Sequence, residues 1–127
     1  SMYHTLCCGG DNMNIGFVGA GKVGFSLGKY FCNNDIKVSG YYSHNLESSK
    51  EAAKFTRSNF YVNLNDLIKE SDIIFITTPD SIISSVWGMI DKSAIKNKIL
   101  CHCSGSLSSK VFSNIENYNA YGYSIHP

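Results

Sequence analysis

Three glycines near the start of the sequence have the spacing of a phosphate-binding turn. Gly19, Gly21 and Gly24 follow the apolar run 14–18 and precede a stretch with helical periodicity. In such a turn the first glycine permits the bend, the second lets the backbone approach a pyrophosphate, and the third lets the helix pack closely. Backbone N–H groups at the start of the helix would bind the phosphates. We therefore predict a dinucleotide-binding site that also includes the three intervening residues, Ala20, Lys22 and Val23.

The same glycines have a second interpretation, in which they serve only the turn and the packing of the helix. The expected strand before them and the expected helix after them favour the nucleotide. Gly28 lies one helical turn beyond Gly24, and a glycine inside a helix is unfavourable relative to alanine. We therefore expect another close contact of the helix at Gly28.

The residues after the second expected strand, 36–42, indicate which dinucleotide is bound. Sheets that prefer NAD place Asp or Glu there, about 20 residues beyond the glycines, to bind the ribose hydroxyls. This sequence has Ser43 and His44 instead, with Lys50 further along. A hydroxyl and an imidazole that can carry charge suit the 2′-phosphate of NADP. We predict NADP as the cofactor, bound more tightly at low pH, with NAD as the alternative; otherwise His44 is an exposed loop residue without a ligand.

Histidines lie at or just past the carboxyl ends of three of the expected strands, at positions 44, 102 and 126. In an open α/β sheet the carboxyl edge of the strands holds the ligand. A histidine there could protonate a carbonyl or an imine as hydride arrives. We predict His102 and His126 as candidate general acids. In the alternative interpretation, His102 is a hydrogen-bonded polar residue at the end of a strand.

Residues at the ends of the fourth and fifth expected strands, 72–78 and 98–103, belong to the same edge of the sheet. If the adenine half of a dinucleotide lies over the first two strands, its nicotinamide half should reach this region. The residues expected there, besides His102, are Thr77, Thr78, Pro79, Asp80, Ser104 and Gly105. Asp80 and Ser106 could instead only cap the helices that follow them.

The cysteines do not predict a metal site or a disulfide framework. Five cysteines are odd in number and irregularly spaced, so we expect reduced thiols. Cys101, His102 and Cys103 include good zinc ligands, but successive residues of a strand point to opposite faces. Three ligands therefore cannot converge from this one strand.

The elements that must position these residues alternate between β-rich and helical stretches. The strands are expected at 14–18, 36–42, 60–62, 72–78, 98–103 and 120–125. Five helices are expected between them: after the glycines, at 46–57, at 66–71 opened by Asn65, from Asp80, and from Ser106. Such alternation predicts an α/β fold, a doubly wound parallel six-stranded sheet of the Rossmann type with strand order 3-2-1-4-5-6. The run 72–78 is apolar throughout and is expected at the centre, and 120–125 at an edge.

Composition excludes several classes of partner. The chain of 127 residues carries a formal net charge of +1, which gives no basic surface for a nucleic acid or an acidic membrane. No apolar stretch approaches the ~20 residues that span a bilayer, and no signal peptide is evident, so we expect a soluble, cytoplasmic protein. Residues 1–12 are expected to be a disordered leader or the remnant of a tag, and 13–127 the dinucleotide-binding domain.

Several segments together resemble one superfamily of reductases. Residues 14–31, 38–45, 72–83, 102–109 and 125–127 look like the N-terminal domain shared by pyrroline-5-carboxylate reductases, deazaflavin-dependent NADP reductases and prephenate dehydrogenases. The resemblance covers residues 13–127 and is closest to an uncharacterised reductase-like branch that carries a helical C-terminal domain. It implies hydride transfer between a nicotinamide cofactor and a small carbonyl or imine substrate.

The resemblance also implies roles for individual residues. The three glycines would bind pyrophosphate, Ser43 and His44 the adenosine phosphate, and residues 78–80 the nicotinamide side. His102, Ser104 and Gly105 match an H-x-S-G element, and His126 matches a histidine that faces the substrate in prephenate dehydrogenases. Relatives usually carry Arg where His44 stands, which weakens the NADP assignment.

A helical domain follows the His-Pro dipeptide in these enzymes, where it closes the substrate pocket and forms a homodimer. This sequence ends at Pro127, so we expect the cofactor domain without that helical domain. The alternative function is a non-catalytic module that binds or senses NAD(P)H. Binding of FAD or S-adenosylmethionine is a third interpretation, but the G-x-G-x-G loop and the following acid typical of methyltransferases are missing.

Overall fold

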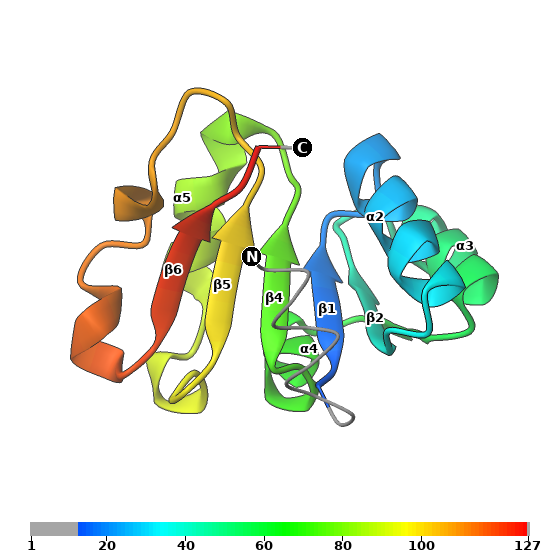
Figure 1. Cartoon of the computed structure of the whole chain (residues 1–127), viewed down its shortest axis with the longest axis horizontal. Coiled ribbons are helices and arrows are strands. Elements are labelled where there is room, and N and C mark those ends of the chain that lie inside the picture. Colours follow the sequence, from blue (N-terminus) through cyan, green and yellow to red (C-terminus); the bar gives the residue numbers. More distant parts are fainter. Residues whose placement is uncertain (1–12, 127) are drawn as a thin grey trace.

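The six expected strands form one parallel sheet in the computed structural model, which describes residues 13–126. The strand order is β3-β2-β1-β4-β5-β6, which confirms the predicted fold class and order. Each strand is parallel to its neighbours, and the arrowheads of β1, β4, β5 and β6 point toward one edge of the sheet, the carboxyl edge (Figure 1). The strands are β1 (Ile15–Val18), β2 (Val38–Tyr42), β3 (Asn59–Tyr61), β4 (Ile73–Ile76), β5 (Ile99–His102) and β6 (Tyr121–Ser124).

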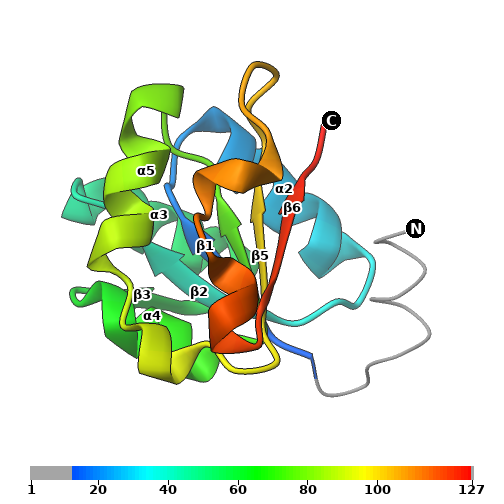
Figure 2. The same ribbon diagram turned by 90° about the vertical axis from the view of Figure 1, so that its left-hand side faces the viewer.

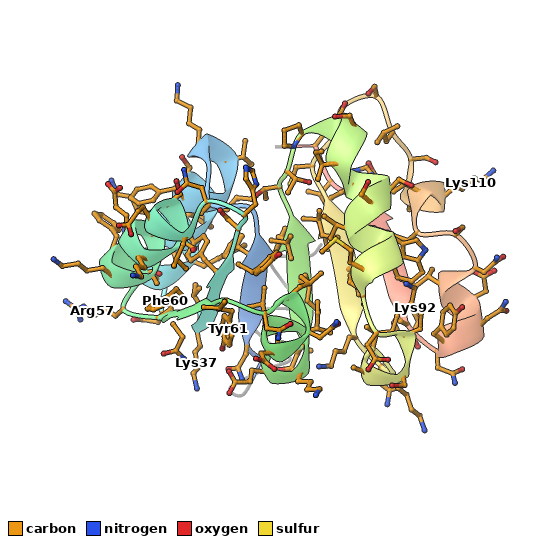
Figure 3. The ribbon with its side chains drawn as sticks, turned by 180° about the vertical axis from the view of Figure 1, so that it is seen from behind. Lys37, Arg57, Phe60, Tyr61, Lys92 and Lys110 are labelled. Carbon is orange, nitrogen blue, oxygen red and sulfur yellow. The ribbon has the colours of Figure 1, made fainter. Side chains whose placement is uncertain are left out.

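Four helices cover the two faces of the sheet. They are α2 (Lys22–Asn33), α3 (Leu46–Thr56), α4 (Leu64–Glu70) and α5 (Asp80–Met89). Buried residues of α2 and α3 belong to one hydrophobic core, and those of α4 and α5 to the other. Figure 2 shows α2 and α5 on opposite sides of the sheet, and α4 and α5 face the viewer in Figure 3.

The central position of β4 follows from its unbroken apolar sequence. Ile73 and Phe75 pack in the core with α2, whereas Ile74 and Ile76 pack in the core with α5. A strand that is buried on both faces cannot place polar side chains on either. The edge strand β6 differs, because Tyr121 and Tyr123 are half-exposed. The predicted central and edge positions are both confirmed.

The close contact expected at Gly28 is confirmed. A Cβ at Gly28 would lie 1.8 Å from Oη of Tyr41, far inside van der Waals contact. Tyr41 is fully buried, stacks on Phe17 at 4.9 Å and donates a hydrogen bond to the Gly24 carbonyl. The missing side chain at Gly28 therefore lets α2 lie directly on β2.

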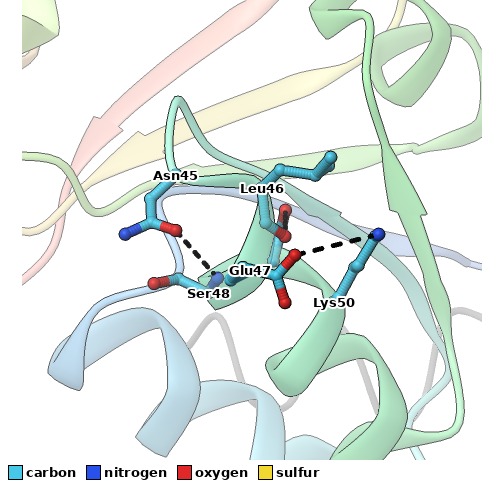
Figure 4. Close-up of polar contacts among 6 residues, drawn as sticks. Asn45, Leu46, Glu47, Ser48 and Lys50 are labelled. Carbon is cyan, nitrogen blue, oxygen red and sulfur yellow. Dashed lines mark hydrogen bonds and ion pairs between the residues drawn. The ribbon is translucent and has the colours of Figure 1, made fainter.

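The start of α3 is capped by a side chain. Asn45 is the N-cap, and its side chain accepts a hydrogen bond from the Ser48 N–H. Within the first turn, Glu47 pairs with Lys50 at 3.9 Å (Figure 4). The Lys50 ammonium also lies 5.3 Å from the centre of the Phe60 ring. Lys50 therefore has partners on α3 and β3.

The predicted helix from Ser106 is wrong. The connection between β5 and β6 contains only two 3₁₀ turns, η2 (Ser109–Val111) and η3 (Ile115–Tyr118). Residues 104–119 are rich in serine and asparagine, which form local hydrogen bonds that compete with a helix. Asn114 has a left-handed conformation, with φ of 59°, so the apolar stripe is interrupted there.

Three predicted helix starts also differ from the structure. Asp80 is the first residue of α5 and Pro79 is its N-cap, so the Asp80 carboxylate does not cap that helix. The cap of η2 is Ser108 and not Ser106. The helix α4 begins at Leu64, and Asn65 instead bonds to the chain around Asp91, where η1 (Lys92–Ala94) starts. Asp80 and Asn65 instead bond to residues that are distant in the sequence, and local sequence does not reveal such partners.

Part of the sequence analysis falls outside the described residues. The expected leader at 1–12 and the proline of the His-Pro dipeptide belong to that part. Across residues 13–126, no helix is both long enough and apolar enough to span a bilayer.

Candidate functional site

A cleft of about 380 Å³ opens at the carboxyl edge of the sheet. Its walls come from the turn after β1, the loop after β2, the loop after β4 and one side of α5. In parallel α/β sheets this edge is where ligands bind. Of the residues predicted from the sequence, the cleft brings together Gly19, Ala20, Gly21, Ser43, His44, Thr77, Thr78 and Pro79.

Two of the three motif glycines are required by the protein itself. Gly19 has φ of +113°, and a Cβ there would lie 2.7 Å from Oγ1 of Thr77. A Cβ at Gly24 would lie 2.3 Å from the Gly19 carbonyl oxygen. The first glycine makes the turn and the third lets α2 pack on that turn, as predicted.

Gly21 has no such requirement within the described chain. Its φ is −79°, and a Cβ built on it would meet no atom within 4 Å. The residue lines the cleft and is the N-cap of α2, but it offers no side chain to cap the helix. The first turn of α2 also contains no acidic residue. The open space above Gly21 is therefore a cradle where backbone N–H groups can bind an anion.

The flanking residues of the glycine turn are divided between two hollows. Ala20 and Gly21 line the cleft and also a second hollow, which Lys22 helps to line. Lys22 is exposed there, so its ammonium is available beside the turn. Val23 is 41% exposed and lines neither hollow.

The loop after β2 carries no acidic side chain into the cleft. Ser43 is held locally, since its hydroxyl donates to the Asn45 carbonyl and accepts from the Asn45 N–H. His44 is exposed at the cleft and makes no hydrogen bond or ion pair with residues 13–126. Among the described residues that line the cleft, none is an Asp, Glu, Lys or Arg. His44 is thus the side chain in this cleft that can acquire positive charge.

Cationic side chains at other positions lie around the periphery of the fold. Figure 3 shows Lys37, Arg57, Lys92 and Lys110 distributed over the molecule rather than gathered at the carboxyl edge. Binding of an anion in the cleft would therefore depend on backbone N–H groups, on His44 and on Lys22 nearby.

Two threonines at the end of β4 have different roles. Thr77 donates to the Gly19 carbonyl at 3.1 Å, which holds the glycine turn against the sheet. Thr78 lines the cleft, and its buried Oγ1 has no hydrogen-bond partner among the described residues. A buried hydroxyl without a partner is unfavourable unless a ligand supplies one.

His102 is fully buried, and both of its ring nitrogens are engaged. Nδ1 accepts the Ser104 N–H at 3.1 Å, and Nε2 lies 2.8 Å from the Ser108 carbonyl. Because Nδ1 accepts, the proton must be on Nε2, which then donates to that carbonyl. The ring also packs edge-on against Phe112. This geometry matches the interpretation of a hydrogen-bonded residue at a strand end, and the general-acid role of His102 stays a prediction.

The serine-rich loop 104–108 lies against the start of α5. The Ser106 hydroxyl donates to Oδ2 of Asp80 at 2.8 Å, and Ser104 Oγ accepts the N–H groups of Ser106 and Leu107. The hydrogen bond from Ser106, with a further contribution from Ser104, lowers the pKa of Asp80 below its ordinary value. Asp80, Ser104 and Gly105 are thus beside the cleft but do not line it.

His126 lies on the other side of this loop. It is exposed and lines a hollow of about 540 Å³ together with Gly105, Ser106 and residues of β6. The structure therefore brings His126 close to the serine-rich loop and not into the cleft at the glycine turn. Its predicted role as a general acid is not tested by this geometry.

The sequence analysis missed the apolar wall of the cleft. Ile82, Val86 and Met89 of α5 line it, together with Tyr42 at the end of β2. Ile82 lies one helical turn before the buried Val86, but it is 43% exposed. An apolar stripe at helical spacing cannot tell a core from a cleft, so no signal in the sequence distinguishes these positions.

Cys101 and His102 of β5 face opposite sides of the sheet, as the alternation of a strand predicts, and Cys103 directly follows the strand. Cys101 and Cys103 pack in the core with α2, whereas the His102 ring contacts Phe112 of the other core. In residues 13–126, no group of three His, Cys, Asp or Glu side chains is arranged to hold a metal ion.

Comparison with known proteins places this fold in a family. A model of the Rossmann-like domain matches residues 9–127, nearly the whole chain. The chain belongs to the Rossmann-like domain family. No curated protein matches its sequence.

Solved structures share the fold of this Rossmann-like domain at low sequence identity. An imine reductase from Myxococcus stipitatus in complex with NADP+ is 20% identical with a TM-score of 0.70, over 85% of this chain and 39% of that one. A reductive aminase from Aspergillus terreus in complex with NADPH and ethyl-5-oxohexanoate is 10% identical with a TM-score of 0.73, over 86% and 39%. UDP-N-acetylglucosamine 3-dehydrogenase from Acidithiobacillus ferrooxidans is 20% identical with a TM-score of 0.67, over 84% and 34%. The Rossmann-like domain thus spans less than half the length of these proteins.

Proposed function

We propose that this Rossmann-like domain binds a nicotinamide dinucleotide at the carboxyl edge of its sheet, as the cofactor-binding part of an oxidoreductase. The observation that carries the proposal is Gly21. The protein itself needs no glycine there, because a Cβ would meet no atom within 4 Å. A pyrophosphate on the N–H groups at the start of α2 would occupy that space.

Further features of the cleft support a dinucleotide over a simple anion. The unpartnered Oγ1 of Thr78 lies in the same cleft as the glycine turn, on the opposite side from the loop after β2. Apolar side chains of α5 provide a surface for an aromatic ring of the ligand. A dinucleotide offers phosphates to the glycine turn, ribose hydroxyls to Oγ1 of Thr78, and aromatic rings to the apolar side chains of α5.

NADP is the preferred dinucleotide in this proposal. No acidic side chain lines the cleft after β2, so the partner that NAD-preferring sheets offer to the ribose diol is missing. His44 is exposed there and can pair with a 2′-phosphate when it is protonated. NAD is the alternative, because an imidazole is a weaker phosphate ligand than the Arg that relatives carry.

The reaction in this proposal is hydride transfer to a small carbonyl or imine substrate. The nicotinamide ring supplies the hydride when the cofactor is bound. The names of the fold neighbours, an imine reductase and a reductive aminase, are consistent with this class of substrate. His126 is exposed and could donate a proton to the substrate. His102 would first have to release one of its two hydrogen bonds.

A non-catalytic module that binds or senses NAD(P)H is the second candidate. The engaged nitrogens of His102 favour it, because that imidazole has no free group to offer a substrate. The chain also spans only 34% to 39% of the solved structures compared here, so the activity and the homodimer of a whole enzyme remain proposals. Turnover of an imine by a protein that binds NADPH would exclude the second candidate.

The proposal is tested by titrating NADPH and NADH into the purified chain and following nucleotide fluorescence. Saturable binding of NADPH that excess NADP+ reverses is expected. The dissociation constant for NADPH should be lower than that for NADH, and the difference should be larger at pH 6 than at pH 8, as His44 is protonated. Absence of binding of either nucleotide contradicts the proposal. Equal affinities at both pH values would remove only the preference for NADP.

A Thr78→Val variant tests the position of the ligand in the cleft. The free protein should be unchanged in stability or more stable, because the substitution removes a buried hydroxyl without a partner. NADPH affinity should fall about tenfold if the ligand is the missing partner. Calorimetric unfolding and fluorescence titration measure the two effects. A stability loss without a loss of affinity would mean that Oγ1 has a partner inside the protein.

A further inference from the structure

His102, Ser104, Ser106 and Asp80 form one hydrogen-bonded unit that ties three segments together. The unit starts in β5, passes through the loop 104–108 and ends at the first residue of α5. At its base, the imidazole of His102 joins both ends of the loop through Ser104 N–H and Ser108 C=O. At its tip, the Asp80 carboxylate accepts from the Ser106 hydroxyl.

The base of this unit is buried and its tip is exposed. His102 and Ser104 have at most 5% of their surfaces exposed, whereas Asp80 and Ser106 face solvent. A buried imidazole with two backbone partners holds a loop in one conformation, since any other would leave buried polar groups unpaired. The exposed pair connects the loop to α5 through a hydrogen bond to a charged acceptor.

The backbone at the centre of the loop is left available. Gly105 is exposed, its N–H makes no hydrogen bond with the described residues, and a Cβ there would meet no atom within 4 Å. As at Gly21, the protein itself does not require a glycine at this position. The loop lies beside the start of α5, directly after Thr78 and Pro79 of the cleft.

We propose that His102 and Asp80 are positioning residues that fix the loop 104–108 as the wall of the site beyond Thr78, where the second half of the dinucleotide is held. His102 acts from within the fold and does not touch the ligand. Asp80 acts through Ser106. This inference rests on the proposed function for its ligand, but the arrangement of the loop can be tested without any ligand.

The first experiment uses the free protein. Nitrogen-15 NMR of the histidine rings should show His102 as the Nε2–H tautomer, and the N–H groups of Ser104, Ser106 and Leu107 should exchange slowly with solvent. In Asp80→Ala the exchange of the Ser106 and Leu107 N–H groups should become faster. An Nδ1–H tautomer, or exchange that Asp80→Ala leaves unchanged, overturns the proposal even where the protein binds NADPH.

The second experiment measures NADPH affinity in variants at the exposed tip. Asp80→Ala and Ser106→Ala should each weaken NADPH binding about tenfold, and the double variant no more than either one, because they break the same link. Asp80→Asn keeps an acceptor for Ser106 and should restore nearly all of the affinity. Ser84→Ala, on the exposed side of α5, is the matched control without effect. Full affinity in both alanine variants, or additive losses, contradicts the proposal.

The third experiment tests the hydrogen bond of His102 at the base of the loop with two variants. His102→Asn keeps an acceptor close to the position of Nδ1 and should retain NADPH affinity within about threefold, whereas His102→Leu should lose about tenfold or more. Equal losses of NADPH affinity in the two variants would contradict a positioning role for the hydrogen bond between Ser104 N–H and His102. If the wild-type chain binds no NADPH, the proposed function fails, and the NMR measurements alone decide the arrangement of the loop.

Discussion

Two helical glycines with different surroundings give opposite predictions for the same substitution. Gly28→Ala should lower the free energy of unfolding by about 1–3 kcal/mol, because the new Cβ meets the buried Tyr41 ring and its hydroxyl at 1.8 Å. Gly88→Ala should raise it by about 0.4–1 kcal/mol, because a Cβ in α5 meets no atom within 4 Å and reduces the entropy of the unfolded chain. Urea unfolding of both variants measures the difference. Equal effects at the two sites would mean that Tyr41 can move aside.

The thiol of Cys101 should be unreactive in the folded protein. Burial, with a smaller contribution from Cys103, raises the pKa of the Cys101 thiol from 9.0 to about 12. Thiolate is the reactive form, so iodoacetamide at pH 8 should modify Cys101 only in denaturant, as peptide mass spectrometry can show. In the unfolded state the Cys101 thiol loses its proton at a lower pH than in the folded state. The contribution of the buried, protonated thiol to stability is therefore complete below pH 9 and is lost as the pH rises toward 12. Rapid labelling of Cys101 in buffer would contradict the burial.

At the residue scale, the sequence predicts the glycine turn well and the polar contacts less well. The motif indicates the turn at Gly19 and the close helix packing at Gly24, because these two roles depend on the local backbone. The role of Gly21 toward a phosphate stays a prediction. The sequence does not indicate that Thr77 holds the turn or that Asp80 binds Ser106, because those partners are 58 and 26 positions apart. Both contacts depend on how β4, β5 and their loops assemble.

At the element scale, the strands and the first four helices follow from hydrophobic periodicity, and the last connection does not. The apolar positions between 107 and 115 have helical spacing, yet the segment forms two short 3₁₀ turns, and Phe112 and Ile115 pack in the core. Spacing alone cannot reveal that Asn114 and Asn119 break the segment with left-handed conformations.

Substitution of Asn114 tests this account of the connection. Its φ is 59°, a region that asparagine and glycine tolerate and alanine does not. Asn114→Ala should therefore lower the free energy of unfolding by about 1–2 kcal/mol, while Asn114→Gly should be nearly neutral. Thermal unfolding of the two variants gives the comparison. A stabilising Asn114→Ala variant would favour the helix that the sequence predicts.

At the scale of the whole molecule, the parallel sheet brings residues from separate parts of the chain to one edge. Gly21, His44 and Thr78 line one cleft because the strands before them run side by side. His126 comes to the other side of the serine-rich loop, since β6 lies beyond β5. The sequence predicts this common edge from strand order. It does not predict that the loop 104–108 separates the cleft at the glycine turn from the hollow that His126 lines.

The most direct test of the central claim is the NADPH affinity of a Gly21→Ala variant beside its unfolding temperature. The dissociation constant should rise at least about tenfold, equivalent to 1.4 kcal/mol, because the Cβ would occupy the space of the pyrophosphate. The unfolding temperature of the free variant should not fall, since that Cβ meets no atom of residues 13–126 within 4 Å. Undiminished NADPH affinity in this variant would contradict binding of a dinucleotide at the glycine turn.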